Sequence, residues 1–354
     1  MTDPVRAIAD AVLYEGYVLW PYRRSALKNA QRFTFGGVYP RAHAQGRVAG
    51  DDPSTMQTQC LVEGGPGARV GVGIRFLHVV WRQLQDADGG DVDELVAAGE
   101  RHLTWEEAVE RETVLEPLGL DELATGRLVP IAIEAGRAEE SLGPEGAVVR
   151  SWEGLRGSLR VRAERVAPDL HRVTARIENL TPWAGGPRDA VMRRTFCSTH
   201  TVLRAERAAF VSLTDPPPAL GEAVETCENH GTWPVLVGAA DERHTLLSSP
   251  IILEDHPRIA PESPGDLFDG GEIDGLLILN ILSLTDEEKA EVRASDPRAR
   301  EVLDRCEALT PEELMRLHGR TVTSSGGRTA TSSGGRRFRR PEAETFPYPE
   351  AETP

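Results

Sequence analysis

Short alternations of apolar and polar residues, separated by turn residues, fill the middle of the chain and restrict its fold more than any other feature. In the segments 158–166 and 171–180, apolar residues occupy every second position, and Pro168-Asp169 lies between the two. This period places the apolar side chains on one face of a β-strand, and a Pro-Asp pair is typical of a turn. Four further segments continue the series: 199–203, 209–213, 233–237 and 246–253. The pattern predicts an antiparallel sheet or a β-sandwich.

The first part of the chain combines one predicted helix with further strands. The segment 5–17 has apolar residues at helical spacing after Asp3 and Pro4, which are favoured at a helix start. A Gly/Pro-rich connection separates the segments 56–62 and 68–83, which we predict to form a β-hairpin. The polar segment that follows ends in a capping-box pattern. We expect patches of helix over 86–109 and a strand over 128–135.

Start and stop signals beyond residue 266 predict three short helices. Thr285 opens the first with a capping box, Asp296-Pro297 opens the second, and Thr310 opens a third that Gly319 closes. Nearly exact repeats of Thr-Val-Thr-Ser-Ser-Gly-Gly-Arg and Pro-Glu-Ala-Glu-Thr follow. Repeats with so little apolar surface predict a disordered tail.

These elements predict an α+β fold with two β-rich lobes, a small three-helix C-terminal cap and a disordered tail. A length of 354 residues fits two domains with an appendage. The polar, Gly- and Pro-containing stretch near residue 145 marks the predicted boundary between the lobes. The expected divisions are 1–145, 146–265, 266–320 and 321–354.

Composition excludes several classes of protein. The chain carries 40 basic and 56 acidic residues, a net charge of −16, and its pI is about 5.1, which makes general nucleic-acid binding unexpected. We find no apolar run long enough to span a membrane and no secretory signal. Its four cysteines are too few and too scattered for a disulfide scaffold. We therefore expect an acidic, soluble protein of the cytoplasm.

Charge is unevenly distributed along the chain. The stretch 17–50 has no acidic residue and six basic ones, and seven of the 19 aromatic residues fall in or just before it, whereas 84–123 carries thirteen acids against two arginines. The two blocks could neutralise each other, or the basic one could bind a partner, because arginine and aromatic side chains are common anchors of protein interfaces. The candidate partner-binding residues are Trp20, Tyr22, Arg23, Arg24, Lys28, Arg32, Phe33 and Phe35.

Two Cys-x2-His pairs form a candidate metal site. Cys197 and His200 make the first pair, and Cys227 and His230 the second. Two thiolates and two imidazoles can complete a tetrahedral shell around zinc, and nickel is a further possibility. However, Cys197 precedes an alternating segment, in which it would point away from His200, and a free cysteine is commonly a small buried residue. The sequence therefore leaves open whether any cofactor binds.

Searches for catalytic motifs return nothing specific. The chain lacks the nucleophile elbow Gly-x-Ser-x-Gly, the zinc motif His-Glu-x-x-His and the lysine of a phosphate-binding loop. The acidic stretch 86–94 lacks the glycine and the final glutamate of a calcium-binding loop. An enzyme of unrecognised type remains an alternative.

Several strings of the sequence resemble, as a set, an uncharacterised bacterial family encoded beside nickel–iron hydrogenase genes. They include Trp-Pro-Tyr-Arg-Arg-Ser-Ala-Leu-Lys-Asn (20–29) and Phe-Gly-Gly-Val-Tyr-Pro (35–40), and the likeness extends from about residue 5 to residue 319. The other strings lie at 14–17, 56–60, 248–253 and 259–270, with the helical run 284–319. The resemblance implies a role in hydrogenase assembly or operation, with hydrogenase subunits or maturation factors as partners. It supplies no catalytic residues.

Together these observations predict a non-catalytic accessory protein that docks to a hydrogenase component. Metal binding through the two Cys-x2-His pairs is one alternative, and an unrecognised enzyme is the other.

Overall fold

The computed structural model describes residues 6, 8–10, 13, 36–46, 52–258, 281–295 and 297–310. Contacts divide the chain into two units, Met1–Gly319 and Arg320–Pro354. The second unit, which contains the predicted disordered tail, lies outside the described residues. All of the described residues lie in the first unit.

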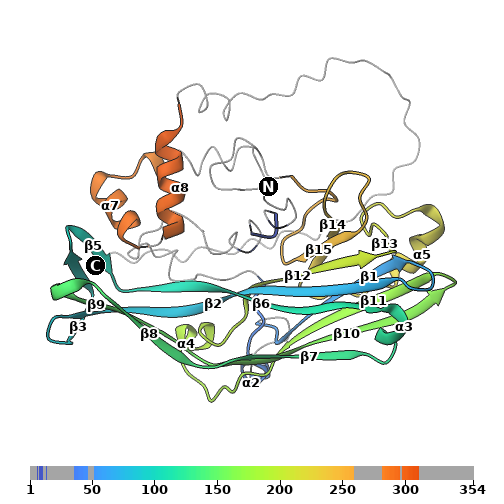
Figure 1. The fold of residues 1–354 in the computed structure, drawn as a ribbon, viewed down its shortest axis with the longest axis horizontal. Helices are drawn as coiled ribbons and strands as arrows, with labels where there is room; N and C mark the ends of the chain where they lie inside the picture. Colours follow the sequence, from blue (N-terminus) through green and yellow to red (C-terminus); the bar gives the residue numbers. More distant parts are fainter. Residues whose placement is uncertain are drawn as a thin grey trace, which may run out of the picture. The chain divides into compact units, whose positions relative to one another are not determined.

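A five-stranded antiparallel sheet forms one layer of the molecule (Figure 1). Its order is β13-β1-β11-β10-β7. The strands are β1 (Thr55–Glu63), β7 (Arg127–Ile133), β10 (Leu155–Ala167), β11 (Leu170–Asn179) and β13 (Ala209–Phe210). Strands β10 and β11 form the hairpin that the alternation predicted. Asp169 turns the chain with a φ of 55°, in the left-handed region that aspartate tolerates better than most residues.

An eight-stranded sheet forms the other layer, built around the long strand β2. Its main order is β14-β15-β12-β2-β9-β8, and β3 and β6 also pair with β2. The strands are β2 (Arg69–Asp86), β3 (Asp91–Val92), β6 (Trp105–Gly119), β8 (Gly136–Ser141), β9 (Gly146–Trp152), β12 (Cys197–Glu206), β14 (Trp233–Leu236) and β15 (Thr245–Ser249). Its pairings are antiparallel. The predicted α+β, β-rich fold class is therefore confirmed.

The predicted hairpin between 56–62 and 68–83 is wrong, although both strands exist. β1 pairs with β11 and β13, whereas β2 pairs with β12, β6 and β9, so the connection crosses from one sheet to the other. Alternation and turn residues are the same for a hairpin and for a sandwich crossing. Only the partners of each strand distinguish the two cases.

The core lies between the two sheets. Met56, Cys60 and Val62 of β1 meet Val72 and Ile74 of β2 in one buried cluster, to which the apolar positions of β10 and β11 also belong. The rings of Phe76 and Phe196 stack in the same cluster with centroids 4.6 Å apart. Burial of this kind stabilises a fold by about 25 cal/mol per Å² of apolar surface.

The predicted helical patches over 86–109 are strands. Residues in this stretch form β3, the hairpin of β4 (Glu94–Ala97) with β5 (Glu100–Leu103), and the start of β6. The hydroxyl of Thr104, predicted to cap a helix, donates instead to the carbonyl of Val92 at 2.9 Å. Pairing along β2 outweighs the weak helical signal, because tertiary context commonly overrides local propensity.

The predicted lobe boundary at residue 145 does not separate two packed units. β8 and β9 lie on either side of it and pair with each other, and β2 pairs with β12 across it. The residues that the structure describes before and after this point therefore share both sheets and one core.

Short helices surround the sheets. They are α2 (Arg41–Ala44), α3 (Leu120–Leu123), α4 (Arg188–Met192) and α5 (Gly221–Glu225), with 3-10 turns η2 (Gly143–Glu145) and η3 (Pro218–Leu220). Within the predicted N-terminal helix, residues 6, 8–10 and 13 are helical, and the rest of 5–17 lies outside the described residues.

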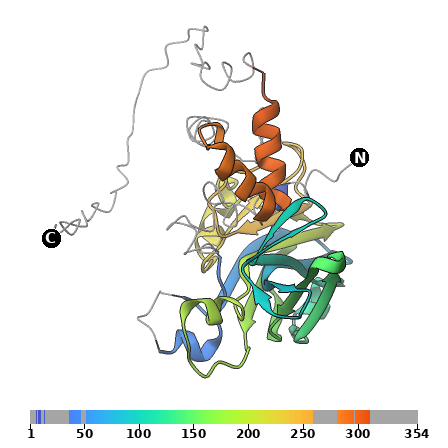
Figure 2. The same cartoon turned by 90° about the vertical axis from the view of Figure 1, so that its left-hand side faces the viewer.

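Two of the three predicted C-terminal helices are present, α7 (Asp286–Ser295) and α8 (Pro297–Ala308). They form a pair beside β5 (Figures 1 and 2). Lys289 and Arg293 of α7 both contact Glu307 of α8. The third predicted helix lies outside the described residues beyond Thr310.

Candidate docking surface

The partner-binding residues predicted from the basic, aromatic stretch lie outside the described residues: Trp20, Tyr22, Arg23, Arg24, Lys28, Arg32, Phe33 and Phe35. Two other basic or aromatic residues of that stretch, Tyr39 and Arg41, are described. Tyr39 is only 3% exposed, and Arg41 pairs with Glu178 of β11. These two residues therefore serve the protein's own packing.

The first Cys-x2-His pair is fully buried in β12. A register shift with Ser198 at a φ of 50° separates Cys197 from His200. Cys197 packs with Leu77 and Val79, and burial raises the pKa of its thiol. Burial, with the nearby Arg75 guanidinium, lowers the pKa of His200 to about 3. The thiol is therefore protonated and the imidazole neutral near pH 7.

The second pair lies elsewhere. Cys227 is half-buried among apolar residues around Leu61, and His230 is exposed where its backbone pairs with Gln57 of β1. In the described part of the chain, no group of three or more His, Cys, Asp or Glu side chains could hold a metal ion. The structure thus does not bring Cys197, His200, Cys227 and His230 together.

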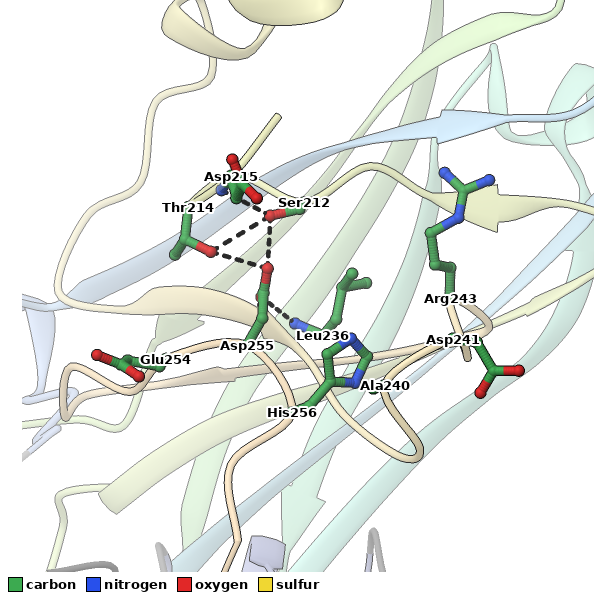
Figure 3. Close-up of a pocket in the computed structure, with 10 residues that line it drawn as sticks. All are labelled: Ser212, Thr214, Asp215, Leu236, Ala240, Asp241, Arg243, Glu254, Asp255 and His256. Carbon is green, nitrogen blue, oxygen red and sulfur yellow. Dashed lines mark hydrogen bonds between the residues drawn. The ribbon is translucent and has the colours of Figure 1, made fainter. Parts of the chain in front are cut away.

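A pocket of about 670 Å³, lined mainly by residues with polar side chains, lies beside β14 (Figure 3). The carboxylate of Asp255 accepts hydrogen bonds from the hydroxyls of Ser212 and Thr214 and from the backbone N–H of Leu236. The hydroxyl of Ser212 donates directly to the carboxylate of Asp255, so His256 does not lie between them as the histidine of a Ser-His-Asp triad would. The carboxylate therefore joins three segments of the chain.

A second polar cluster surrounds Tyr39. Arg188 donates to the carboxylate of Asp52 at 2.6 Å and to the hydroxyl of Tyr39 at 2.7 Å. The Nε2 of His43 lies 2.9 Å from the same carboxylate, and the His43 ring stacks on Tyr39 and makes a T-shaped contact with Trp183. The cluster ties α2 and α4 to the region around residue 52.

Electrostatics in this cluster hold Asp52 ionised. Burial raises the pKa of Tyr39, although the charge of Arg188 opposes this effect. Burial also acts to raise the pKa of Asp52, but the hydrogen bonds from His43 and Arg188 outweigh it and leave the pKa below its usual value. These contacts make a closed structural network rather than an open site.

The outer face of the five-stranded sheet carries a cluster of arginines that other described residues do not neutralise. Arg160 and Arg162 alternate with the core residues of β10, and Arg176 alternates with those of β11. Arg160 lies directly opposite Arg176 in the hairpin. All three side chains are exposed. We call Arg160, Arg162 and Arg176 the arginine face.

Three other arginines at or beside this sheet differ, because each has a carboxylate partner. Arg156 pairs with Glu134 at 2.6 Å, Arg172 lies 3.8 Å from Glu164, and Arg41 binds Glu178. In the described part of the chain, the arginine face makes no such ion pair; its one hydrogen bond runs from Arg176 to Gln57 at 3.3 Å. Like charges that lie opposite each other in a sheet are destabilising, so this arrangement has a cost.

Sequence reasoning missed the arginine face, although a signal for it was present. The alternation over 158–166 and 171–180 identified the core positions, and the polar positions between them are then on the opposite face. The turn at Asp169 and the register shift between Arg165 and Ala167 together put Arg160 opposite Arg176. The three arginines lie on two strands and form no run along the chain, so the sequence alone does not show them as one cluster.

The sequence matches no model of a known protein family, and no curated protein matches it. Among the helices that the structure describes, none is long and apolar enough to cross a membrane.

Proposed function

We propose that this protein is a non-catalytic accessory or assembly protein that acts in the cytoplasm by docking to another protein. The observation that carries the proposal is the arginine face: three exposed guanidinium groups on a rigid sheet, in a chain with a net charge of −16. Arginine is enriched at protein interfaces, and complementary charge guides association. A cluster that lowers the stability of its own sheet is best explained by a partner that neutralises it.

The resemblance to proteins encoded beside hydrogenase genes supplies the proposed partner, a nickel–iron hydrogenase subunit or maturation factor. The enzyme alternative has less support, because the Asp255 carboxylate in the described pocket is occupied by three donors of the protein itself. The metal alternative has no assembled ligand set among the described residues.

Quantitative affinity purification from the native cells tests the proposal. The tagged full-length chain would be compared with Arg160→Glu/Arg176→Glu and with a control of equal charge change, Arg137→Glu/Arg204→Glu, whose exposed arginines lie on β8 and β12 of the other sheet. We expect hydrogenase proteins to co-purify with the wild type and the control, and to be lost from the first variant.

Two other results would contradict parts of this proposal. If the partner remains with Arg160→Glu/Arg176→Glu, the arginine face does not dock it. If no hydrogenase protein co-purifies with the wild type, the hydrogenase association is wrong. A further variant, Arg23→Glu/Arg24→Glu, tests the basic stretch separately.

A further inference from the structure

Ion pairs on either side of the arginine face limit its size. On this face of β10 and β11, the cross-strand pairs are, in order, Ser158–Glu178, Arg160–Arg176, Arg162–Thr174 and Glu164–Arg172. Both glutamates already pair with arginines outside the face. The exposed positive charge therefore covers two adjacent strands and about 7 Å along them.

The neighbouring side chains hold this surface in place. The Oε1 of Gln57 accepts from Arg176, and the Nε2 of Gln57 donates to the carbonyl of Glu228 at 3.1 Å. Gln59 donates to Thr174 and accepts from the backbone N–H of Glu228. These bonds fix the rim of the face before any ligand arrives, which lowers the entropic cost of binding.

From this geometry we infer that the arginine face binds a short acidic segment of the partner protein, with its carboxylates over Arg160, Arg162 and Arg176. The inference rests on the proposed function and specifies the chemistry of the partner. Arginine matches a carboxylate through two parallel N–H···O bonds. Alternate residues of an extended peptide are about 7 Å apart, which is the spacing of Arg160 and Arg162 along β10.

A nucleic acid fits this surface less well. Sheets that bind single strands stack bases on aromatic side chains. Among the described outward positions of β7, β10, β11 and β1 none is aromatic; they include Leu128, Ser158, Thr174 and Gln59. The glutamates that border the face would repel a long polyphosphate, whereas a few spaced carboxylates fit between them.

Fluorescence anisotropy with the full-length protein tests the inference. The probes are a labelled peptide of alternating Glu and Ser, the same peptide with Gln for Glu, and a labelled single-stranded oligonucleotide, each at low ionic strength. We expect the Glu peptide to bind and the Gln peptide not to bind. Arg160→Glu/Arg176→Glu should weaken Glu-peptide binding about tenfold or more, and Arg137→Glu/Arg204→Glu should leave it unchanged.

A conservative variant separates geometry from charge. Arg160→Lys/Arg176→Lys keeps the charge but loses the two-pronged contact, so we expect an intermediate loss of peptide affinity. Thermal unfolding of each variant verifies that it is folded.

The outcomes distinguish this inference from the proposed function. If the wild type binds the oligonucleotide through the arginine face more tightly than the Glu peptide, or binds neither, the inference is overturned. The proposed function would still stand if Arg160→Glu/Arg176→Glu loses its partner in cells. If the partner stays bound to that variant, docking through the arginine face is wrong, and if no hydrogenase protein co-purifies with the wild type, the hydrogenase association is wrong.

Discussion

At the scale of single residues, Asp52 connects the most groups in the cluster around Tyr39. Its carboxylate lies 2.6 Å from Arg188 and 2.9 Å from His43, and its side chain is only 11% exposed. We predict that Asp52→Asn lowers the free energy of unfolding by about 2 kcal/mol near pH 7, because it removes charged hydrogen bonds and leaves Arg188 without its counter-charge. Urea unfolding measures this. Glu134→Gln, which breaks an exposed pair, should change stability by less than about 1 kcal/mol.

The contribution of Asp52 depends on pH. Its pKa is lowered in the folded protein, so its stabilising effect is complete above the unfolded value of about 3.9 and disappears as pH falls through the folded pKa. We therefore expect the stability difference between wild type and Asp52→Asn to shrink as pH drops below about 4. Urea unfolding at a series of pH values measures it. A difference that stays constant to the lowest pH would mean that the charge of Asp52 does not stabilise the fold.

At the scale of elements, the arginines of the β10–β11 hairpin lower its stability but provide the proposed binding surface. Arg160 opposes Arg176, so Arg160→Glu replaces a repulsive pair with an attractive one. We predict that it raises the free energy of unfolding by about 0.5 kcal/mol. Arg156→Glu makes the same charge change on the same face of β10 but breaks a pair with Glu134, and it should give no gain. Chemical denaturation of both variants tests this, and equal effects would exclude the cross-strand explanation.

Gly157 of β10 lets the two sheets approach each other. A Cβ at this position would lie 2.5 Å from the carbonyl oxygen of Glu178 and 2.7 Å from the ring of Phe196. Gly157→Ala should therefore displace the ring that stacks on Phe76 and destabilise the fold by about 1–3 kcal/mol. The control Gly221→Ala adds its methyl group to open space and should change stability by no more than about 0.5 kcal/mol. Thermal unfolding compares the two.

Local elements could be predicted from the sequence, and their partners could not. The hairpin of β10 and β11 follows from alternation and a turn at Asp169, because both signals lie within 25 residues of chain. The sequence predicts helix at the start of β6, because the local pattern does not show the long pairing with β2 that makes this segment a strand. In the same way, the Cys-x2-His spacing is a local signal and does not predict whether the two pairs meet. Cys197 and Cys227 pack in separate apolar clusters.

At the scale of the molecule, the course of β2 decides how the chain unfolds. β2 pairs with strands on both sides of residue 145, and β1 pairs across this point with β11 and β13. We predict that the full-length chain unfolds in one transition, with the same midpoint by far-ultraviolet circular dichroism and by tryptophan fluorescence. Two separate transitions would indicate independent lobes.

Truncation separates the one-unit structure from the two-lobe interpretation. A chain ended after Gly319 keeps the whole first unit, so its transition should match that of the full-length protein. The segment 146–319 alone lacks β1 and β2, which removes one partner each from β11 and β12 and exposes their core faces. A fold that is stable by only about 5–15 kcal/mol cannot lose that much burial, so this segment should show no cooperative transition. A cooperative transition of 146–319 on its own would restore the division near residue 145.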